Sequence, residues 1–260
     1  MSEKKITDQL ERVVTIKKLP SRIVSLVPSQ TELLYDLGLD ESLVGITKFC
    51  CHPTNWKFKK SKIGGTKAVD IEKIRRLQPD LIIGNKEENT QEDIAILETI
   101  APVWISDVTT FDDALSLIVD LGELLGKQAK ANQLVQEINT AFDQLVKIEP
   151  PLKVAYFIWD SPDFIAGKAT FIDTMLSSCG FQNCCKETRY PAWNDEFETP
   201  ELVLLSSEPY PFKEKHVAKF QEKFPTAKVM FVDGEYFSWY GSRLRLAPDY
   251  FQQLIREVSE

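Results

Sequence analysis

The sequence predicts two α/β lobes joined by a long helix. Residues 111–147 form the one long helical pattern, with apolar residues at three- and four-residue steps. On both sides of it, short β-branched runs alternate with helical patterns. Residues 78–87 and 199–208 also echo each other, since each has a proline-led turn, a buried strand and a polar loop. A chain of 260 residues is long enough to build two small lobes of like construction.

Composition excludes several classes of protein. The net charge of −8, with charges of both signs interspersed, argues against a nucleic-acid binder. No apolar run reaches the ~18 residues of a membrane span. Five cysteines are an odd number and include two adjacent pairs, so reduced thiols are expected rather than a disulfide framework. The charged N-terminus lacks the apolar core of a secretion signal.

The first lobe is expected to consist of strands that alternate with helices. The strands are predicted at 13–16, 22–27, 43–47, 81–83 and 103–105. Residues 28–32 lead into a helix that runs through residue 37, and further helices are predicted at 71–77 and 91–100. Ser29 and Glu32 have the spacing of a capping box, and Asp70 is placed to cap the helix at 71–77. The loop after the first buried strand is also where open α/β sheets bind ligands.

The long helical pattern divides in two. Gly122 and Gly126 interrupt it, so residues 112–125 are predicted to complete the first lobe and residues 127–147 to form the connecting helix. The domain prediction is therefore an N-terminal lobe at 1–125, a bridging helix at 126–149 and a C-terminal lobe at 150–260. Pro150 and Pro151 make a rigid break before the second lobe.

The second lobe repeats the alternation. Its strands are predicted at 154–159, 202–205 and 228–233, and its helices at 170–178, 212–224 and 248–258. The loop at 189–194 carries two aromatic residues among polar ones.

Catalytic and metal chemistry have little support in the residue pattern. His52 follows two cysteines, but no second closely spaced ligand set exists, so a structural or pocket-lining role is favoured over metal ligation. The Gly64-Gly65 turn lacks the spacing of a phosphate loop, and no GxSxG nucleophile motif is present. No catalytic residue and no catalytic cofactor are therefore assigned.

Aromatic residues outside the periodic patterns indicate a pocket. Trp159, Trp193, Phe237, Trp239 and Tyr240 all fall at predicted strand ends or in loops. Each could serve the core instead, but several at one edge of a sheet are typical of the apolar wall around a large, partly flat ligand. On similar loops, Lys86 and Arg243 could receive carboxylates, amides or phosphates of that ligand, or could be solvated surface charges.

Three motifs carry a resemblance to a known family. Residues 22–32 (RIVSLVPSQTE), Asp70-Ile-Glu72 and residues 77–83 (LQPDLII) resemble the substrate-binding proteins of bacterial ABC importers for cobalamin, iron-siderophores and haem, the helical-backbone metal receptors. The resemblance runs from about Asp8 to the C-terminus and is closest to the cobalamin-binding proteins. It implies two Rossmann-like lobes bridged by a single long helix, with a ligand cleft between the lobes.

The resemblance also implies positions for the functional residues. Glu72 matches the permease-docking glutamate of the first lobe, and Glu196 or Glu198 is the candidate in the second. Cleft aromatics of the family fall near Phe49, Trp159, Trp193 and Phe237, while Lys67, Asn85 and Lys86 stand where cobalamin binders often carry aromatics. The full set of predicted ligand-binding residues is Phe49, Lys67, Asn85, Lys86, Trp159, Tyr190, Trp193, Phe237, Trp239, Tyr240 and Arg243.

The expected function is capture of a corrinoid or similar metal chelate, without protein ligation of the metal, and delivery to an importer permease. Binding of an iron-siderophore or haem is the alternative within the class. A cytosolic enzyme on the same scaffold is the alternative from another class. The lack of a secretion signal favours it, because a receptor must reach the outer side of the membrane. We expect a monomer, located in the periplasm or cell envelope according to the resemblance, although without a signal peptide a cytoplasmic location stays open.

Overall fold

The computed structural model describes residues 3–260, apart from the side chain of Lys57, and divides into two compact units. The first unit comprises residues 1–108, 112–136 and 240–243, and the second comprises 109–111, 137–239 and 244–260. Helix α6 (Gln128–Asp143) thus contributes its first half to one unit and its second half to the other. The domain boundaries at 125 and 149 stay a prediction. No helix of the described chain is long and apolar enough to cross a bilayer.

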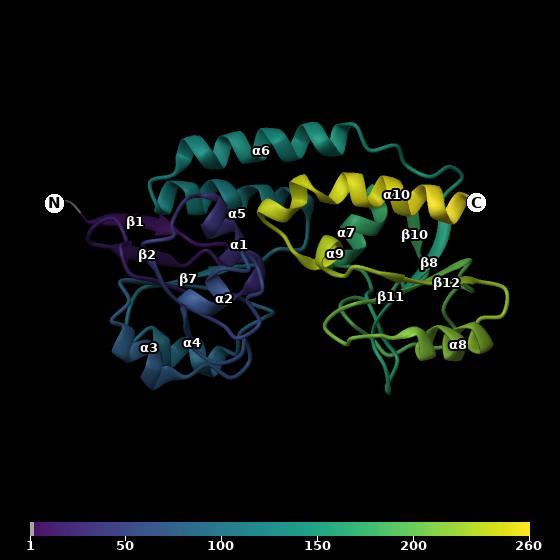
Figure 1. Cartoon of the computed structure of the whole chain (residues 1–260), viewed down its shortest axis with the longest axis horizontal. Helices are drawn as coiled ribbons and strands as arrows, with labels where there is room; N and C mark the ends of the chain where they lie inside the picture. Colours follow the sequence, from purple (N-terminus) through teal and green to yellow (C-terminus); the bar gives the residue numbers. More distant parts are fainter. Residues whose placement is uncertain (1–2) are drawn as a thin grey trace. The chain divides into compact units, whose positions relative to one another are not determined.

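A five-stranded parallel sheet forms the centre of the first unit (Figure 1). Its order is β5 (Ser61–Lys62), β4 (Leu43–Ile46), β3 (Ile23–Ser25), β6 (Leu81–Asn85) and β7 (Val103–Ser106). Because every pairing is parallel, the carboxyl ends of these strands meet at one edge, which we call the first carboxyl edge. The predicted strands are confirmed, whereas the short β5 was not predicted.

Helices cover this sheet because each presents an apolar stripe. Ile74 of α3 (Ile71–Leu77) and Leu97 of α4 (Gln91–Leu97) pack on the sheet face that carries Val24, Ile82 and Ile105. The remaining helices are α1 (Pro28–Asp36), the short α2 (Trp56–Lys59) and α5 (Phe111–Leu124). An antiparallel hairpin of β1 (Lys4–Thr7) and β2 (Val13–Ile16) precedes the sheet.

The local capping predictions had mixed outcomes. Asp70 caps α3 as predicted, since its carboxylate accepts from the Lys73 amide at 2.9 Å. The capping box of Ser29 and Glu32 is wrong, because α1 begins at Pro28 with no side-chain cap. Proline suits this first helical position because it has no amide hydrogen to satisfy.

The second unit contains a similar parallel sheet. Its order is β10 (Phe181–Asn183), β8 (Leu152–Trp159), β11 (Leu202–Ser206) and β12 (Lys228–Val232), with β9 (Phe164–Ile165) antiparallel to β8. Phe220 and Phe224 of α8 (Glu214–Lys223) and its C-cap pack on one face. The other helices are α7 (Phe171–Ser178), α9 (Glu235–Ser238), the 3₁₀ turn η1 (Ser242–Arg245) and α10 (Ala247–Ser259). The carboxyl ends of the parallel strands form the second carboxyl edge.

The echo noticed in the sequence is a structural repeat. Strands β6 and β11 are fully buried, and β6 pairs in parallel with β3 while β11 pairs in parallel with β8. Directly before them, Asp80 accepts from the Arg22 amide at 2.8 Å and Glu201 accepts from the Lys153 amide at 2.9 Å. The same acidic residue type thus fixes the same strand start in both units.

The long helical pattern is broken as predicted, but the second helix is shorter. Gly126, with φ +65°, lies between α5 and α6, where a left-handed conformation favours glycine. Helix α6 ends at Asp143, whereas the prediction continued it to residue 147.

Candidate functional site

The first carboxyl edge carries an exposed aromatic ring. Phe49 follows β4 and is 54% exposed, with the Lys48 ammonium 5.0 Å from its ring centroid. A Cβ placed on Gly65 would lie 3.2 Å from Cε2 of Phe49, so one side of the phenyl ring packs against the glycine turn. The phenyl face is therefore available for stacking, with one cation beside it.

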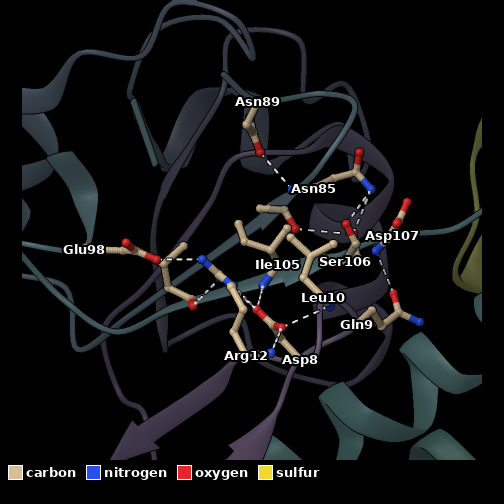
Figure 2. A network of polar contacts seen from close by, with 12 residues as sticks. Asp8, Gln9, Leu10, Arg12, Asn85, Asn89, Glu98, Ile105, Ser106 and Asp107 are labelled. Carbon is tan, nitrogen blue, oxygen red and sulfur yellow. Dashed lines mark hydrogen bonds and ion pairs between the residues drawn. The ribbon is translucent and has the colours of Figure 1, made fainter. Parts of the chain in front are cut away.

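Asn85, predicted to touch the ligand, is buried and shapes the loop instead (Figure 2). Its amide nitrogen donates to the Ser106 hydroxyl at 2.9 Å, and its oxygen accepts from the Glu87 and Glu88 amides. Asn89 closes the turn by accepting from the Asn85 amide at 2.8 Å. The loop after β6 is thus held by its own side chains.

Both predicted lysines of this edge have partners within the unit. Lys86 forms an ion pair with Asp107 at 2.5 Å. Lys67 donates to the backbone carbonyl of Glu87, which joins the loop after β5 to the loop after β6. Both lysines remain exposed, but Lys86 already contacts a carboxylate and Lys67 already contacts a backbone carbonyl.

A clamp on the outer strand of this sheet was not predicted from the sequence. The buried Asp8 carboxylate accepts from the Ile105 amide at 3.2 Å and from the Arg12 side chain, and Arg12 donates to the Val103 carbonyl (Figure 2). Gln9 accepts from the Asp107 amide at 3.1 Å. The clamp satisfies the free edge of β7, which otherwise invites pairing with another chain, and it positions Asp107 beside Lys86.

Arg243 and Tyr240 are buried in the first unit rather than exposed in a pocket. Arg243 donates to both carboxylate oxygens of Glu32, at 2.8 and 3.0 Å. Burial raises the pKa of Glu32 above its ordinary value, although Arg243 opposes this. The Arg243 guanidinium is therefore engaged by the carboxylate of Glu32. The sequence spacing had instead assigned Glu32 to helix capping.

On the second carboxyl edge, Trp159 is the most exposed predicted residue. It ends β8, is 42% exposed, and packs against Tyr210 with ring centroids 5.5 Å apart. The Tyr210 hydroxyl lies 3.2 Å from Nε2 of the buried His216. The Trp159 indole therefore packs against Tyr210 on one side, and its exposed part is available to contact a ligand.

Trp193 and Tyr190 lie on the loop before β11 with different exposure. Trp193 is half-buried, with its ring 4.9 Å from that of Phe224, and its indole nitrogen donates to Asp195 at 3.1 Å. Tyr190 is 37% exposed. Trp193 therefore contributes to the core of the second unit as well as to its surface.

Phe237 and Trp239 are core residues in this structure. Phe237 is fully buried on the short helix α9, with its ring 5.1 Å from Tyr156 and 4.8 Å from Phe251. Trp239 is buried and donates to the Glu208 carboxylate at 2.9 Å. Their place in a loop of the sequence suggested a pocket wall, but no ligand reaches Phe237 without repacking of this core.

Glu208 is a buried acidic residue that the sequence analysis missed. It also accepts from the Ser238 hydroxyl at 2.5 Å. Burial raises its pKa, and the nearby carboxylates of Glu235 and Asp233 raise it further, against the two hydrogen bonds. No local sequence pattern distinguishes this glutamate from a surface one.

Hollows occur in both units. One of about 480 Å³ lies at the ends of β11 and β12, and it is lined by Ser207, Phe212, Lys213, Phe231, Val232 and Asp233. Another of about 450 Å³ lies in the first unit between the hairpin and the junction of α5 and α6. Only the first of these is at a carboxyl edge, where open α/β sheets bind ligands.

The proposed docking glutamates differ in their surroundings. Glu72, in the first turn of α3, has a 73% exposed side chain and a long 3.5 Å contact with Arg75. Glu198 forms ion pairs with Lys186 at 2.5 Å and Lys153 at 3.2 Å, whereas Glu196 is exposed on the preceding turn.

His52 is half-buried, and within either unit taken alone no three His, Cys, Asp or Glu side chains of the described residues converge as metal ligands.

Comparison with known sequences gives a matching family model and several similar proteins. A family model described as periplasmic binding protein matches residues 23–202. The ABC transporter substrate-binding lipoprotein YvrC of Bacillus subtilis, whose name describes it as uncharacterized, is 32% identical over 193 residues, covering 70% of this chain and 61% of that protein. A vitamin B12-binding protein of Pectobacterium atrosepticum is 25% identical over 256 residues, covering 93% of this chain and 90% of its own length.

Solved structures share the fold. A possible iron-binding, periplasmic solute-binding protein of Staphylococcus epidermidis superposes with a TM-score of 0.76 at 20% identity, covering 94% of this chain and all of that one (100%). The petrobactin-binding protein YclQ of Bacillus subtilis gives 0.78 at 18% identity, covering 99% and 98%. Because the family model spans more than half of the sequence, and the two α/β units agree with it, this chain belongs to the periplasmic binding protein family.

Proposed function

We propose that this chain is the substrate-binding protein of an ABC importer and that it binds a corrinoid of the cobalamin class. The observation that carries the proposal is the family match over residues 23–202, joined by relatives named as vitamin B12-binding proteins over 93% of the chain. YvrC, named as an ABC transporter substrate-binding lipoprotein, supports the importer and a place at the cell envelope. These relatives are named as binding proteins, which supports a role that is not enzymatic.

Within each unit, exposed aromatic rings support the proposal of a large, partly flat ligand. Phe49 on the first edge and Trp159 on the second each present an exposed ring backed by protein. Stacking and apolar contact suit a macrocycle whose metal keeps its own chelate ligands, so no protein ligand to the metal is proposed. Tyr190 extends the aromatic surface of the second unit.

Iron-siderophores and haem are the second candidate ligands. Solved proteins that bind petrobactin and haem share this fold, but at 18% and 20% identity they speak only for the fold. The named relatives over most of the chain favour the corrinoid.

We also propose that Glu72 of the first unit docks onto the importer permease, with Glu196 as its counterpart in the second. Exposure of the Glu72 side chain supports this role. Glu198 is the weaker choice because Lys153 and Lys186 already pair with it, so a permease arginine would have to displace them.

Titration of the purified chain with cyanocobalamin tests the ligand. Tryptophan fluorescence should be quenched with a Kd below roughly 10 μM, about −7 kcal/mol. Trp159→Ala should weaken binding by at least ~0.5–1.5 kcal/mol, the typical energy of one aromatic pair, while Phe58→Ala, at an exposed phenylalanine of α2, should not. If cyanocobalamin, haem and ferric siderophores all fail to bind, the proposed function is wrong.

A further inference from the structure

His216 connects the start of α8 to the loop that follows β11, and all of its contacts lie within the second unit. The side chain is buried at the third position of the helix. Its Nδ1 accepts from the backbone amide of Lys213, the N-cap residue, at 2.7 Å. Such a bond satisfies a backbone donor that the first helical turn leaves without a partner. One ring nitrogen of His216 is therefore committed to the helix start.

This bond determines which nitrogen of the neutral imidazole carries the proton. A backbone amide can only donate, so Nδ1 is the acceptor and the proton lies on Nε2. The Lys213 carbonyl is also 3.1 Å from Nδ1, but a proton on Nδ1 would point two N–H groups at each other across 2.7 Å. The neutral ring of His216 thus has one donor, Nε2–H, for the residues around it.

Tyr210 is the acceptor for this proton. Its hydroxyl oxygen is 3.2 Å from Nε2, whereas Oδ2 of Asp160 is 3.8 Å away, beyond an ordinary hydrogen bond. Asp160 is also engaged in an ion pair with Lys219 of α8. The hydrogen bond from His216 therefore fixes the hydroxyl end of the tyrosine.

The Tyr210 ring is in contact with both His216 and Trp159. Its centroid is 5.5 Å from that of the imidazole and 5.5 Å from that of the indole. Phe212 holds the same pair from the core, with its centroid 4.9 Å from Tyr210 and 5.4 Å from His216. A row of rings thus runs from the buried His216 through the half-buried Tyr210 to the exposed Trp159.

Trp159 needs such support because it is a surface residue at the end of β8. An exposed side chain occupies several rotamers, and ordering it when a ligand binds costs conformational entropy. The Tyr210 ring limits the orientations of the indole before the ligand arrives. The stability of that ring position in turn depends on His216.

We propose that His216 is a positioning residue for ligand binding that acts through Tyr210 on Trp159. The Nε2 proton fixes the tyrosine ring, and the tyrosine ring orients the indole. The inference rests on the function proposed above, in which Trp159 contacts the ligand. It adds to that site two residues, Tyr210 and His216, that neither the aromatic pattern nor the family resemblance assigned to it.

NMR of the whole chain without ligand tests these contacts. The chain has two histidines and five tryptophans, so the ring signals are few. At pH 8, long-range ¹H–¹⁵N spectra should show the His216 ring protonated on Nε2. After labelling with 5-fluorotryptophan, the ¹⁹F signal of Trp159, identified with Trp159→Phe, should shift in His216→Gln and in Tyr210→Phe.

The variants are chosen so that the fold is kept. Glutamine at the third helical position can still reach the N-cap amide, and Tyr210→Phe removes only a hydroxyl, as circular dichroism should confirm. Tyr35→Phe, which removes a hydroxyl in the first unit, is the control and should leave the Trp159 signal in place. A proton on Nδ1 of His216, or a Trp159 signal that stays in place in both variants, overturns the inference.

Calorimetric titration with cyanocobalamin tests the effect on binding. His216→Gln and Tyr210→Phe should each weaken binding about three- to tenfold, the range of one hydrogen bond. In a Trp159→Ala background the same substitutions should change the affinity less than about twofold, because residues that act through one another are not additive. Equal losses in both backgrounds overturn the inference and leave the proposed function standing. If cyanocobalamin, haem and ferric siderophores all fail to bind the wild type, the proposed function is wrong and the binding role of His216 falls with it, whereas the NMR result still decides whether His216 orients Trp159.

Discussion

Glu32 and Arg243 form a two-pronged ion pair within the first unit although 211 positions separate them in the sequence. The pair holds residues 240–243 in this unit, while the chain on either side belongs to the second unit. A Cβ on Gly241 would lie 3.4 Å from Cβ of Leu33, an ordinary van der Waals distance. The φ of +126° is the reason that glycine is favoured where this segment lies against α1.

Removing one partner of this pair should destabilise the chain strongly. Glu32→Ala removes the carboxylate that faces a guanidinium only 8% exposed, and breaking a buried pair in this way costs about 3–5 kcal/mol. We expect a loss near the lower figure, because the Glu32 side chain keeps some exposure. Urea unfolding followed by circular dichroism measures it.

The double variant Glu32→Leu/Arg243→Met is the control. It removes both charges of the pair and should be more stable than Glu32→Ala, which keeps the buried guanidinium after its carboxylate partner is gone. A double variant as unstable as the single one would show that the packing of these side chains matters more than their charges.

Glu208 should make stability fall as pH rises above the acid range. Burial, followed by repulsion from Glu235, raises its pKa in the folded chain above the ordinary value of 4.5. The folded chain then binds this proton more tightly than the unfolded chain does. Its contribution is complete below 4.5 and is lost as pH rises through the folded pKa.

Glu208→Gln removes this dependence. The difference in unfolding free energy, variant minus wild type, should increase between pH 4.5 and 7 in urea titrations at several pH values. Glu222→Gln, at an exposed glutamate of α8, should show no such trend. A Glu208→Gln difference that is constant or falls with pH would contradict the assigned protonation.

The alternation of strands and helices could be predicted because it depends on local apolar patterns. The echo of residues 78–87 and 199–208 even identified corresponding strands, β6 and β11. The short elements β5 and α9 were not predicted, because two to four residues are too few to show a periodic apolar pattern. The split of the long helix followed from Gly126, whose φ of +65° a local signal can indicate.

Predictions of the candidate site were weaker because partners distant in sequence decide which side chains are exposed. Spacing assigned Glu32 to a capping box, while its partner, Arg243, lies near the other end of the chain. Phe237 was expected in a pocket wall, but Tyr156 and Phe251 enclose it in the core. Phe49 and Trp159 are exposed as a ligand site requires, and their role stays a prediction.

Gly122 permits close packing of α5 and α6 in the first unit. A Cβ at this position would lie 2.4 Å from Cβ of Ala131, which is shorter than any ordinary contact. Gly122→Ala should therefore destabilise by about 1–3 kcal/mol, despite the better helix propensity of alanine. Ser116→Ala, exposed on the same helix, should stay within about 0.5 kcal/mol of wild type in thermal or urea unfolding. A stabilised Gly122→Ala would mean that the two helices separate at little cost.

Charge reversal at the proposed docking residues should reduce transport and leave ligand affinity unchanged. Glu72→Lys and Glu196→Lys each place a cation where a permease arginine would have to bind, and like charges at an interface oppose association. Uptake of labelled cobalamin through the cognate permease and fluorescence titration of the purified variants measure the two quantities separately. Glu222→Lys is the control for the change in net charge.

Glu198→Lys should lose its ion pairs with Lys153 and Lys186 and affect transport less than Glu196→Lys. The opposite order would move the docking role to Glu198, and a loss of affinity in Glu72→Lys would place that residue in ligand binding instead of docking.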